Sequence, residues 1–275
     1  ENMSKRKIRT GIIYLILMAA TVFVLVPIIW LIITSFKPRG EIYMPSMPSK
    51  WVLDSYSELL QNFSFDKYFK NSLIVASVTT VLVCIVSIPA AYGFANYRYC
   101  GSRKIFTGCV FLRMFPFITL LIPLYIYISK LGLMNTKLAL VIANTTFNLP
   151  MSLWIMEACF RGLPNELIDA ASIDGASRIK TFLQVMLPVS KPSIATIVIL
   201  TFLNAWNEFM GPLIFLNEKS KFTLQMGIRY FQQMFGTEYT LIMASTTMSL
   251  IPILVIYMCA QKYFIEGIAA SGIKG

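Results

Sequence analysis

Residues 166–188 read ELIDAASIDGASRIKTFLQVMLP, and this stretch decides how the rest of the chain is interpreted. Pro164, just before it, favours the start of a helix. Gly175 favours a stop, because the residue that follows a helix often adopts a left-handed conformation. Ser177 can cap a second helix, and Pro188 is expected to end it. The second helix would carry an apolar stripe made of Ile179, Phe182, Leu183 and Met186.

Small and acidic side chains gather on this predicted pair of helices. The small ones leave room for the groove of another protein to approach, and the acidic ones offer charged hydrogen-bond acceptors beside them. A pair of amphipathic helices lying on a membrane surface explains the same pattern equally well. The small residues are Ala170, Ala171, Gly175 and Ala176, and the acidic ones are Asp169 and Asp174.

Composition identifies a membrane protein. Of the 275 residues, 56% are hydrophobic and 13% are charged, against about 25% charged residues in soluble domains. The net charge of +11 would suggest nucleic acid in a soluble protein. Here the basic residues lie mostly between apolar runs, which favours contact with lipid headgroups and a role in setting topology.

Six apolar runs approach or exceed the length of about 20 residues that a membrane-spanning helix needs. We therefore expect an all-α membrane protein that forms a single transmembrane domain over residues 1–275. The basic N-terminal cluster favours a cytoplasmic N-terminus, so both termini and residues 164–188 would be cytoplasmic and residues 37–70 would face outside. A short helix is expected from Asp54, and residues 216–238 are expected to form a polar loop. The predicted spans are residues 10–36, 71–97, 105–129, 138–157, 192–215 and 239–261.

Polar side chains inside these spans are candidates for a transport pathway. Arg113 marks either a pathway or a side chain that reaches back to the membrane interface. The others fit a sugar path, in which amides meet hydroxyl groups and aromatic rings stack on sugar faces, but they fit hydrogen bonding between helices equally well. They are Asn144, Asn148, Asn204, Trp206, Asn207 and Glu208.

Motifs for catalysis are missing from the sequence. It has no His, no G-x-x-x-x-G-K-[ST] loop for ATP, no G-x-S-x-G, and no cluster of metal ligands. Its five cysteines include no C-x-x-C pair. We therefore expect a chain that is not an enzyme and that binds neither a cofactor nor a metal itself.

The quoted stretch resembles the EAA loop of permease subunits in binding-protein-dependent ABC importers. The matching residues are Asp169-Ala170-Ala171, Asp174-Gly175-Ala176 and Leu187-Pro188, with Asp169 standing where the family usually has Glu. Three further segments, FLRMFPFITLLIPLY, AWNEFMGPLIFL and QKYFIEGIAASGIKG, resemble the carbohydrate branch of the family, the MalG-like subunits.

This resemblance implies a type I importer fold with a cytoplasmic coupling loop at residues 164–188. It implies a homologous second permease, two ATPase subunits that bind ATP and Mg²⁺, and an extracytoplasmic solute-binding protein, all at a bacterial or archaeal cytoplasmic membrane. The cargo would be a sugar, with oligosaccharides favoured; glycerol-phosphate or a polyol is the alternative within the class, and a stand-alone secondary transporter the alternative outside it. The residues implied to dock on the ATPase are Asp169, Ala170, Ala171, Asp174, Gly175, Ala176, Phe182, Leu187 and Pro188.

Overall fold

The computed structural model describes the backbone of residues 2–97, 99–235 and 238–272, and the side chains of residues 9–97, 99–233 and 238–262. The side chains of most of the basic N-terminal cluster and of the C-terminal segment from residue 263 onward therefore lie outside the described part. The described backbone is mostly helical, and its longest connection is the segment between α1 and α2. Its elements are α1 (Asn2–Ser35), η1 (Arg39–Glu41), α2 (Asp54–Asn62), α3 (Phe65–Asn96), α4 (Ser102–Phe111), η2 (Leu112–Met114), α5 (Phe117–Lys130), α6 (Lys137–Gly162), α7 (Glu166–Ile173), α8 (Arg178–Thr181), a π-helical turn η3 (Phe182–Met186), α9 (Leu187–Val189), α10 (Lys191–Trp206), α11 (Met210–Phe215), η4 (Lys219–Lys221), α12 (Leu224–Phe235) and α13 (Tyr239–Gly272).

Four of the predicted spans are continuous helices that are long and apolar enough to cross a membrane. They are α1, α3, α6 and α13. The predicted span 105–129 falls on one bent pair of helices, and 192–215 overlaps the second half of another. The expectation of an all-α membrane protein is confirmed, with four candidate spans, or six if each bent pair is one span. The short helix expected from Asp54 is α2.

The predicted span 105–129 is wrong as a single helix. The chain bends by 107° between the segment that ends at Met114 and α5. Phe115 is extended, with φ −78° and ψ 134°, and Pro116 follows it. A proline pushes the preceding residue out of the helical region, so the break lies where the sequence places Pro116.

The predicted span 192–215 also needs correction. A bend of 75° separates the helical segment ending at Val189 from α10. At its other end α10 stops at Trp206, and α11 begins only at Met210. The intervening residues 207–209 give this region a polar break that the apolar composition of the run did not reveal.

The segment 216–238, expected to be a polar loop, contains the helix α12. Leu224 and Phe231, seven residues apart, are both buried, which is the spacing of one face of a helix. Gly227 lies between them, and a Cβ there would approach the Tyr68 ring to 2.3 Å. The run is therefore a helix, and its first turn lies close to the Tyr68 ring of α3.

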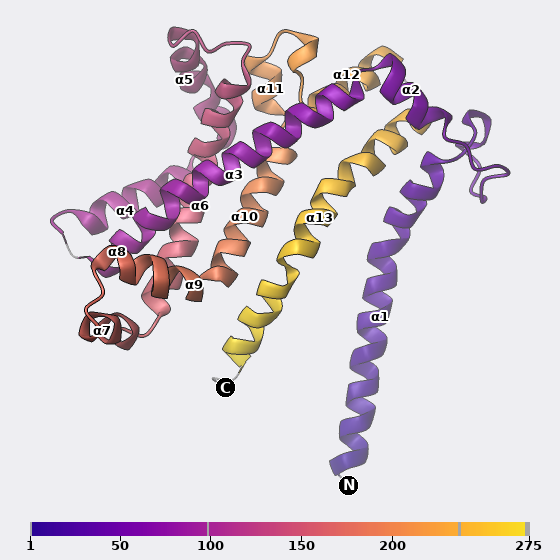
Figure 1. Cartoon of the computed structure of the whole chain (residues 1–275). Coiled ribbons are helices and arrows are strands. Elements are labelled where there is room, and N and C mark those ends of the chain that lie inside the picture. Colours follow the sequence, from indigo (N-terminus) through magenta and orange to yellow (C-terminus); the bar gives the residue numbers. More distant parts are fainter. Residues whose placement is uncertain (1, 98, 236–237, 273–275) are drawn as a thin grey trace. The chain divides into compact units, whose positions relative to one another are not determined.

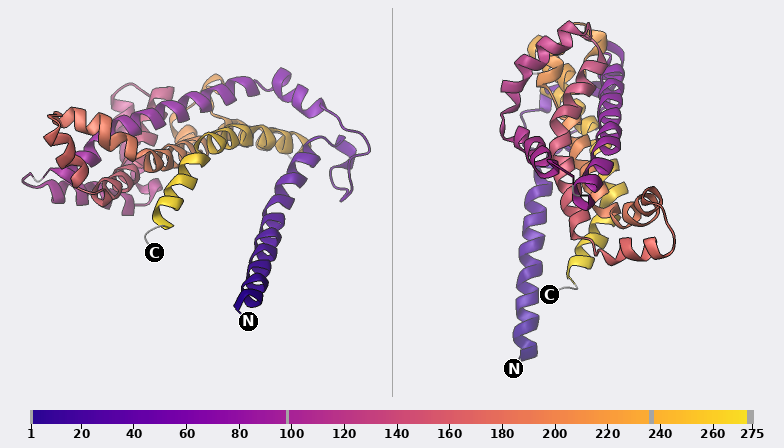
Figure 2. Two further views of the ribbon diagram at one scale, coloured as in Figure 1. Left: turned by 60° about the horizontal axis from the view of Figure 1, so that its bottom comes forward. Right: turned by 90° about the vertical axis from the view of Figure 1, so that its left-hand side faces the viewer.

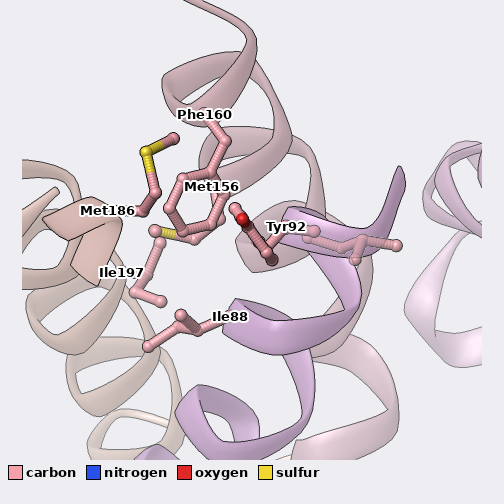
Figure 3. Close-up of a cluster of buried hydrophobic side chains, with 8 residues drawn as sticks. Ile88, Tyr92, Met156, Phe160, Met186 and Ile197 are labelled. Carbon is pink, nitrogen blue, oxygen red and sulfur yellow. The ribbon is translucent and has the colours of Figure 1, made fainter. Parts of the chain in front are cut away.

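The chain divides into two compact units, and the larger one holds the candidate functional residues. It comprises Phe65–Gly227 with the segment that begins at Pro252. In this unit α3, α6 and α10 pack side by side (Figures 1 and 2). Their shared core contains Ile88, Ala91, Tyr92, Leu153, Met156, Phe160, Met186 and Ile197, and Figure 3 shows it converging from the three helices and the π-helical turn.

The smaller unit comprises the residues up to Ser64 together with Ile228–Ile251. Where α1 ends, Lys37 is buried, with its ammonium 2.7 Å from the Met44 carbonyl and 4.6 Å from the centre of the Trp30 ring. Arg39 forms ion pairs with Glu58 and Glu238. These contacts give the segment after α1 a defined shape despite its prolines.

Candidate functional site

The first half of the segment 166–188 folds as the sequence predicts. α7 ends at Ile173, and Gly175 has a φ of 73°. The Ala176 N–H donates to the Ala171 carbonyl at 2.9 Å, which closes the helix end. Ser177 then accepts a hydrogen bond from the Lys180 N–H at 3.4 Å and caps α8. The predicted pair of helices around a glycine turn is therefore present.

The second half departs from the prediction of one α-helix that ends at Pro188. Residues Phe182–Met186 form a π-helical turn, and the helical run continues to Val189. Pro188 has no N–H to donate to the preceding turn, so one backbone hydrogen bond is missing directly after the π-helical turn. The predicted apolar stripe is accordingly split: Phe182 and Met186 pack against the core, whereas Ile179 is 72% exposed and Leu183 is also exposed.

The predicted docking residues do not all share one surface. Three of them face the bundle, which corrects the expectation: Ala171 is buried, while Phe182 and Leu187 pack against the core cluster. Sequence reasoning missed Ile173, which is 87% exposed, although a lone large apolar residue among small and acidic ones was a signal. The residues that remain on the surface are Asp169, Ala170, Asp174, Gly175 and Pro188, with Ala176 half-buried.

A cavity of about 770 Å³ brings together most of the polar residues predicted from the spans. It lies between the bent α4–α5 segment, α6, α10 and the start of α11. Its wall also carries aromatic rings, among them Phe117 and Phe147, whose centroids are 4.2 Å apart. The polar lining residues include Arg113, Asn144, Thr146, Asn148, Asn204, Asn207 and Glu208.

Three of the cavity amides form a ladder. The Asn204 Nδ2 donates to Asn148 Oδ1 at 2.9 Å, and the Asn148 Nδ2 donates to the Asn144 carbonyl at 2.8 Å. The Asn144 Nδ2 donates in turn to the Leu140 carbonyl at 2.9 Å. Each of the three amides donates one hydrogen bond within the protein, so the ladder both joins α6 to α10 and orients the side-chain oxygens of its members.

Glu208 caps the start of α11. Its Oε1 accepts the Gly211 N–H at 2.8 Å. A Cβ at Gly211 would lie 2.7 Å from Glu208 Oε2, so glycine is what lets the carboxylate approach this helix start. Asn207, beside it, accepts a hydrogen bond from the Gln225 side chain at 3.4 Å.

Trp206 does not line the cavity, which corrects its assignment to the pathway. Its side chain is 1% exposed, stacks on Phe202 and meets the Phe69 ring edge to face. The large apolar ring is thus part of the core between α3 and α10. Arg113, in contrast, is exposed beside the 107° bend and lines the cavity.

A polar turn fixes the beginning of α6, beside the cavity. Asn135, with a φ of 59°, accepts the N–H groups of Asn217 and Glu218, both at 3.2 Å. Hydrogen bonds from Lys221 and Ser220, with the charge of Lys221, lower the pKa of Glu218 to about 2. Among the described residues, no group of three or more His, Cys, Asp or Glu could hold a metal ion.

Comparisons with known proteins agree with this architecture. A family model described as "Binding-protein-dependent transport system inner membrane component" matches residues 85–269. The chain is 37% identical over 268 residues to the trehalose/maltose transport system permease protein MalG of Thermococcus litoralis, covering 96% of each chain. It is 31% identical over 256 residues to the diacetylchitobiose uptake system permease protein NgcG of Streptomyces coelicolor, covering 92% of this chain and 85% of that one.

A solved structure shares the fold. The crystal structure of a bacterial ABC transporter involved in the import of the acidic polysaccharide alginate contains a chain that matches with a TM-score of 0.77 at 23% identity. The match covers 92% of this chain and 96% of that one. With the family model matching well over half of the sequence, this chain belongs to the family of binding-protein-dependent transport system inner membrane components, the permease subunits of ABC importers.

Proposed function

We propose that this chain is the membrane-spanning permease subunit of an ATP-driven importer for sugars, with oligosaccharides as the preferred class. It would pair with a homologous second permease. Two ATPase subunits would bind ATP and Mg²⁺ and dock on residues 164–188 at the cytoplasmic side. An extracytoplasmic solute-binding protein would deliver the sugar, partly through residues 37–70. Closure of the ATPases would then switch the spans between inward- and outward-facing states, with both termini of this chain cytoplasmic.

The observation that carries the proposal is the cavity. Amide and carboxylate oxygens suit the hydroxyl groups of a sugar, and the aromatic wall suits the apolar faces of its rings. Asn144, Asn204 and Glu208 supply such oxygens within one cavity. The two relatives described above are named for trehalose or maltose and for diacetylchitobiose, which supports a sugar as the cargo.

Residues 164–188, which we call the coupling segment, expose a surface that supports the assignment of ATP hydrolysis to another chain. The sequence lacks a phosphate-binding loop. Asp169, Asp174 and Gly175 are exposed on a compact two-helix segment attached to the bundle. Such a segment fits a surface groove of a partner and can move with the spans to which it is joined.

One observation favours a second candidate, a glycerol-phosphate or other anionic solute. Arg113 lines the cavity and would attract an anion. Glu208 lines the same cavity and opposes this preference. A neutral sugar brings no charge that either Arg113 or Glu208 would repel, so we favour it.

The test is uptake by the whole transporter in vesicles, with the partner permease, the ATPases and the binding protein. We expect ATP-dependent uptake of neutral oligosaccharides and reduced uptake in Asn204→Ala with the complex still assembled. Thr21→Ala, at an exposed position of α1 whose hydroxyl donates only to its own helix, is the control and should transport normally.

Three outcomes would contradict this function. Uptake driven by an ion gradient without ATP would indicate a secondary transporter. Preference for glycerol-phosphate would favour the anionic alternative. Loss of assembly in Asn204→Ala would mean that the amide ladder serves only to join α6 to α10.

A further inference from the structure

An aromatic cluster attaches the coupling segment to the bundle. The Phe182 ring, from the π-helical turn, lies 4.8 Å from the Tyr92 ring of α3 and 6.4 Å from the Phe160 ring of α6, measured between centroids. Tyr92 and Phe160 are themselves 5.4 Å apart, edge to face. Tyr92 and Phe160 are buried, and Figure 3 shows them beside Met186. Three separate elements therefore meet at these three rings, which we call the aromatic joint.

A second contact continues the joint towards α8. The Arg178 guanidinium lies 5.4 Å from the centre of the Tyr97 ring. The Tyr97 ring in turn meets the Tyr92 ring at 5.8 Å and 90°. The segment around the second helix thus also contacts the end of α3 through Arg178 and the Tyr97 ring.

The first helix of the segment contacts the core cluster through one side chain, Ile168. A polar cavity of about 890 Å³ lies between α7, the ends of α3 and α6, and the start of α4. Asp169 and Ile168 of α7 line it from one side, and Asn96 and Arg103 from the other. In α7, Ala171 is the buried residue. The second half supplies more of the contacts with the core cluster, through Phe182, Met186 and Leu187.

The π-helical turn determines where that second half makes contact. It directs Phe182 and Met186 into the core while Leu183 stays exposed. Packed aromatic rings have little free volume, so they transmit a displacement, whereas a void would absorb it. Turns of this kind occur often at functional sites.

We propose that the aromatic joint of Tyr92, Phe160 and Phe182 transmits the movement of the coupling segment to α3 and α6. This inference rests on the proposed importer function. The three are positioning residues: they touch neither ATP nor the solute. Removing a ring should therefore leave ATPase docking and hydrolysis intact while reducing the solute moved per ATP.

The test compares Phe182→Ala with Leu183→Ala in the complete transporter. These neighbours share the π-helical turn, but one side chain faces the joint and the other is exposed. For Phe182→Ala we expect the ATPases to co-purify and to hydrolyse ATP, while uptake per ATP falls about 5-fold or more. Leu183→Ala should keep the wild-type ratio of uptake to hydrolysis.

A double mutant identifies the joint itself. Tyr92→Ala should lower uptake per ATP like Phe182→Ala, and the two together should lower it no further than either alone, because both remove one contact. Tyr92→Phe keeps the ring and should retain coupling. Phe182→Leu keeps apolar volume for folding but removes the ring, and should show a partial loss.

The inference is overturned if assembled Phe182→Leu and Phe182→Ala complexes keep the wild-type uptake per ATP, or if the double mutant is additive. It is also overturned if uptake and hydrolysis fall together. A wild-type complex that shows no solute-dependent hydrolysis would instead contradict the proposed importer function.

Discussion

Helices α1 and α6 are both apolar enough to cross a membrane, yet the more hydrophobic of the two is the less buried. The α1 span has a mean hydropathy of 2.9, and none of it is buried within the chain. The α6 span has a mean hydropathy of only 1.4, and half of it is buried. In a membrane the side chains that face lipid must be apolar, whereas those inside the protein can pair with one another. The most hydrophobic span is therefore the most exposed one.

The buried polar residues of α6 explain its low hydropathy. Asn144, Asn148, Ser152 and Glu157 are all buried in this helix. Each has a partner: the amide ladder, the Thr201 hydroxyl at 3.3 Å from Ser152, and Arg161 paired with Glu157. Helix α3 shows that hydropathy alone does not set burial, since 39% of its span is buried at a hydropathy of 2.4 because it packs against both α6 and α10.

The largest expected effect comes from truncating a buried side chain. Met156 of α6 has no exposed surface, whereas Met18 of α1 is 69% exposed. Met156→Ala should lower the free energy of unfolding by about 2–5 kcal/mol, because it leaves a void in the core. Met18→Ala should change it by about 0.5 kcal/mol or less. Thermal unfolding of the purified complex measures both, and equal losses would contradict the contrast between the helices.

A smaller effect is expected from hydroxyl groups. The Ser152 hydroxyl meets Thr201 of another helix, whereas the Thr21 hydroxyl of α1 donates to the Leu17 carbonyl of its own helix at 2.8 Å. Ser152→Ala should cost about 0.6 kcal/mol, the mean for hydrogen bonds between membrane helices. Thr21→Ala should leave stability unchanged. A larger loss for Thr21→Ala in the same unfolding assay would mean that α1 depends on polar contacts that α6 lacks.

The smallest effect concerns how the beginning of α6 is held. The pKa of Glu218 is lowered to about 2 by Lys221 and Ser220, so its contribution is present above the usual pKa and is lost as the pH falls from about 4.5 towards 2. Because the ion pair is exposed, high salt should weaken it. Protease cleavage of the turn should rise with acid in the wild type. In Glu218→Gln the cleavage rate should be high already and independent of pH; a pH profile like that of the wild type would contradict this assignment.

The sequence predicted the spans well and their breaks poorly. Counting apolar residues locates a membrane run, but it does not show where backbone hydrogen bonding stops. Pro116 signals the bend in 105–129 only when its effect on Phe115 is considered. The bend near Ser190 lies between Pro188 and Pro192, two residues beyond the helix end that Pro188 predicts. The helix α12 was missed because the apolar residues of its short run also alternate with polar ones, as they would outside a helix.

In the candidate sites too, some features could be predicted from the sequence and others could not. Arg113, Asn144, Asn148, Asn204, Asn207 and Glu208 line one cavity, and their role as a pathway stays a prediction. Trp206 is apolar enough to enter the core, and it does. The turn at Gly175 and the cap at Ser177 could be predicted because turns and caps depend on single residues. The π-helical turn could not be predicted, because it depends on how Phe182 packs against distant helices.

The bend at Phe115 and Pro116 has a consequence for water. Backbone that is not helical persists at membrane depth only where protein covers it or where it lines a wet space. Leu112, Arg113, Phe115 and Phe117, on both sides of the bend, line the cavity. The residues beside the bend therefore meet an open space inside the larger unit rather than lipid alone. Under the proposed importer function, a solute that enters this space would exchange its hydration shell for protein contacts, and the protein would have to close one end before opening the other.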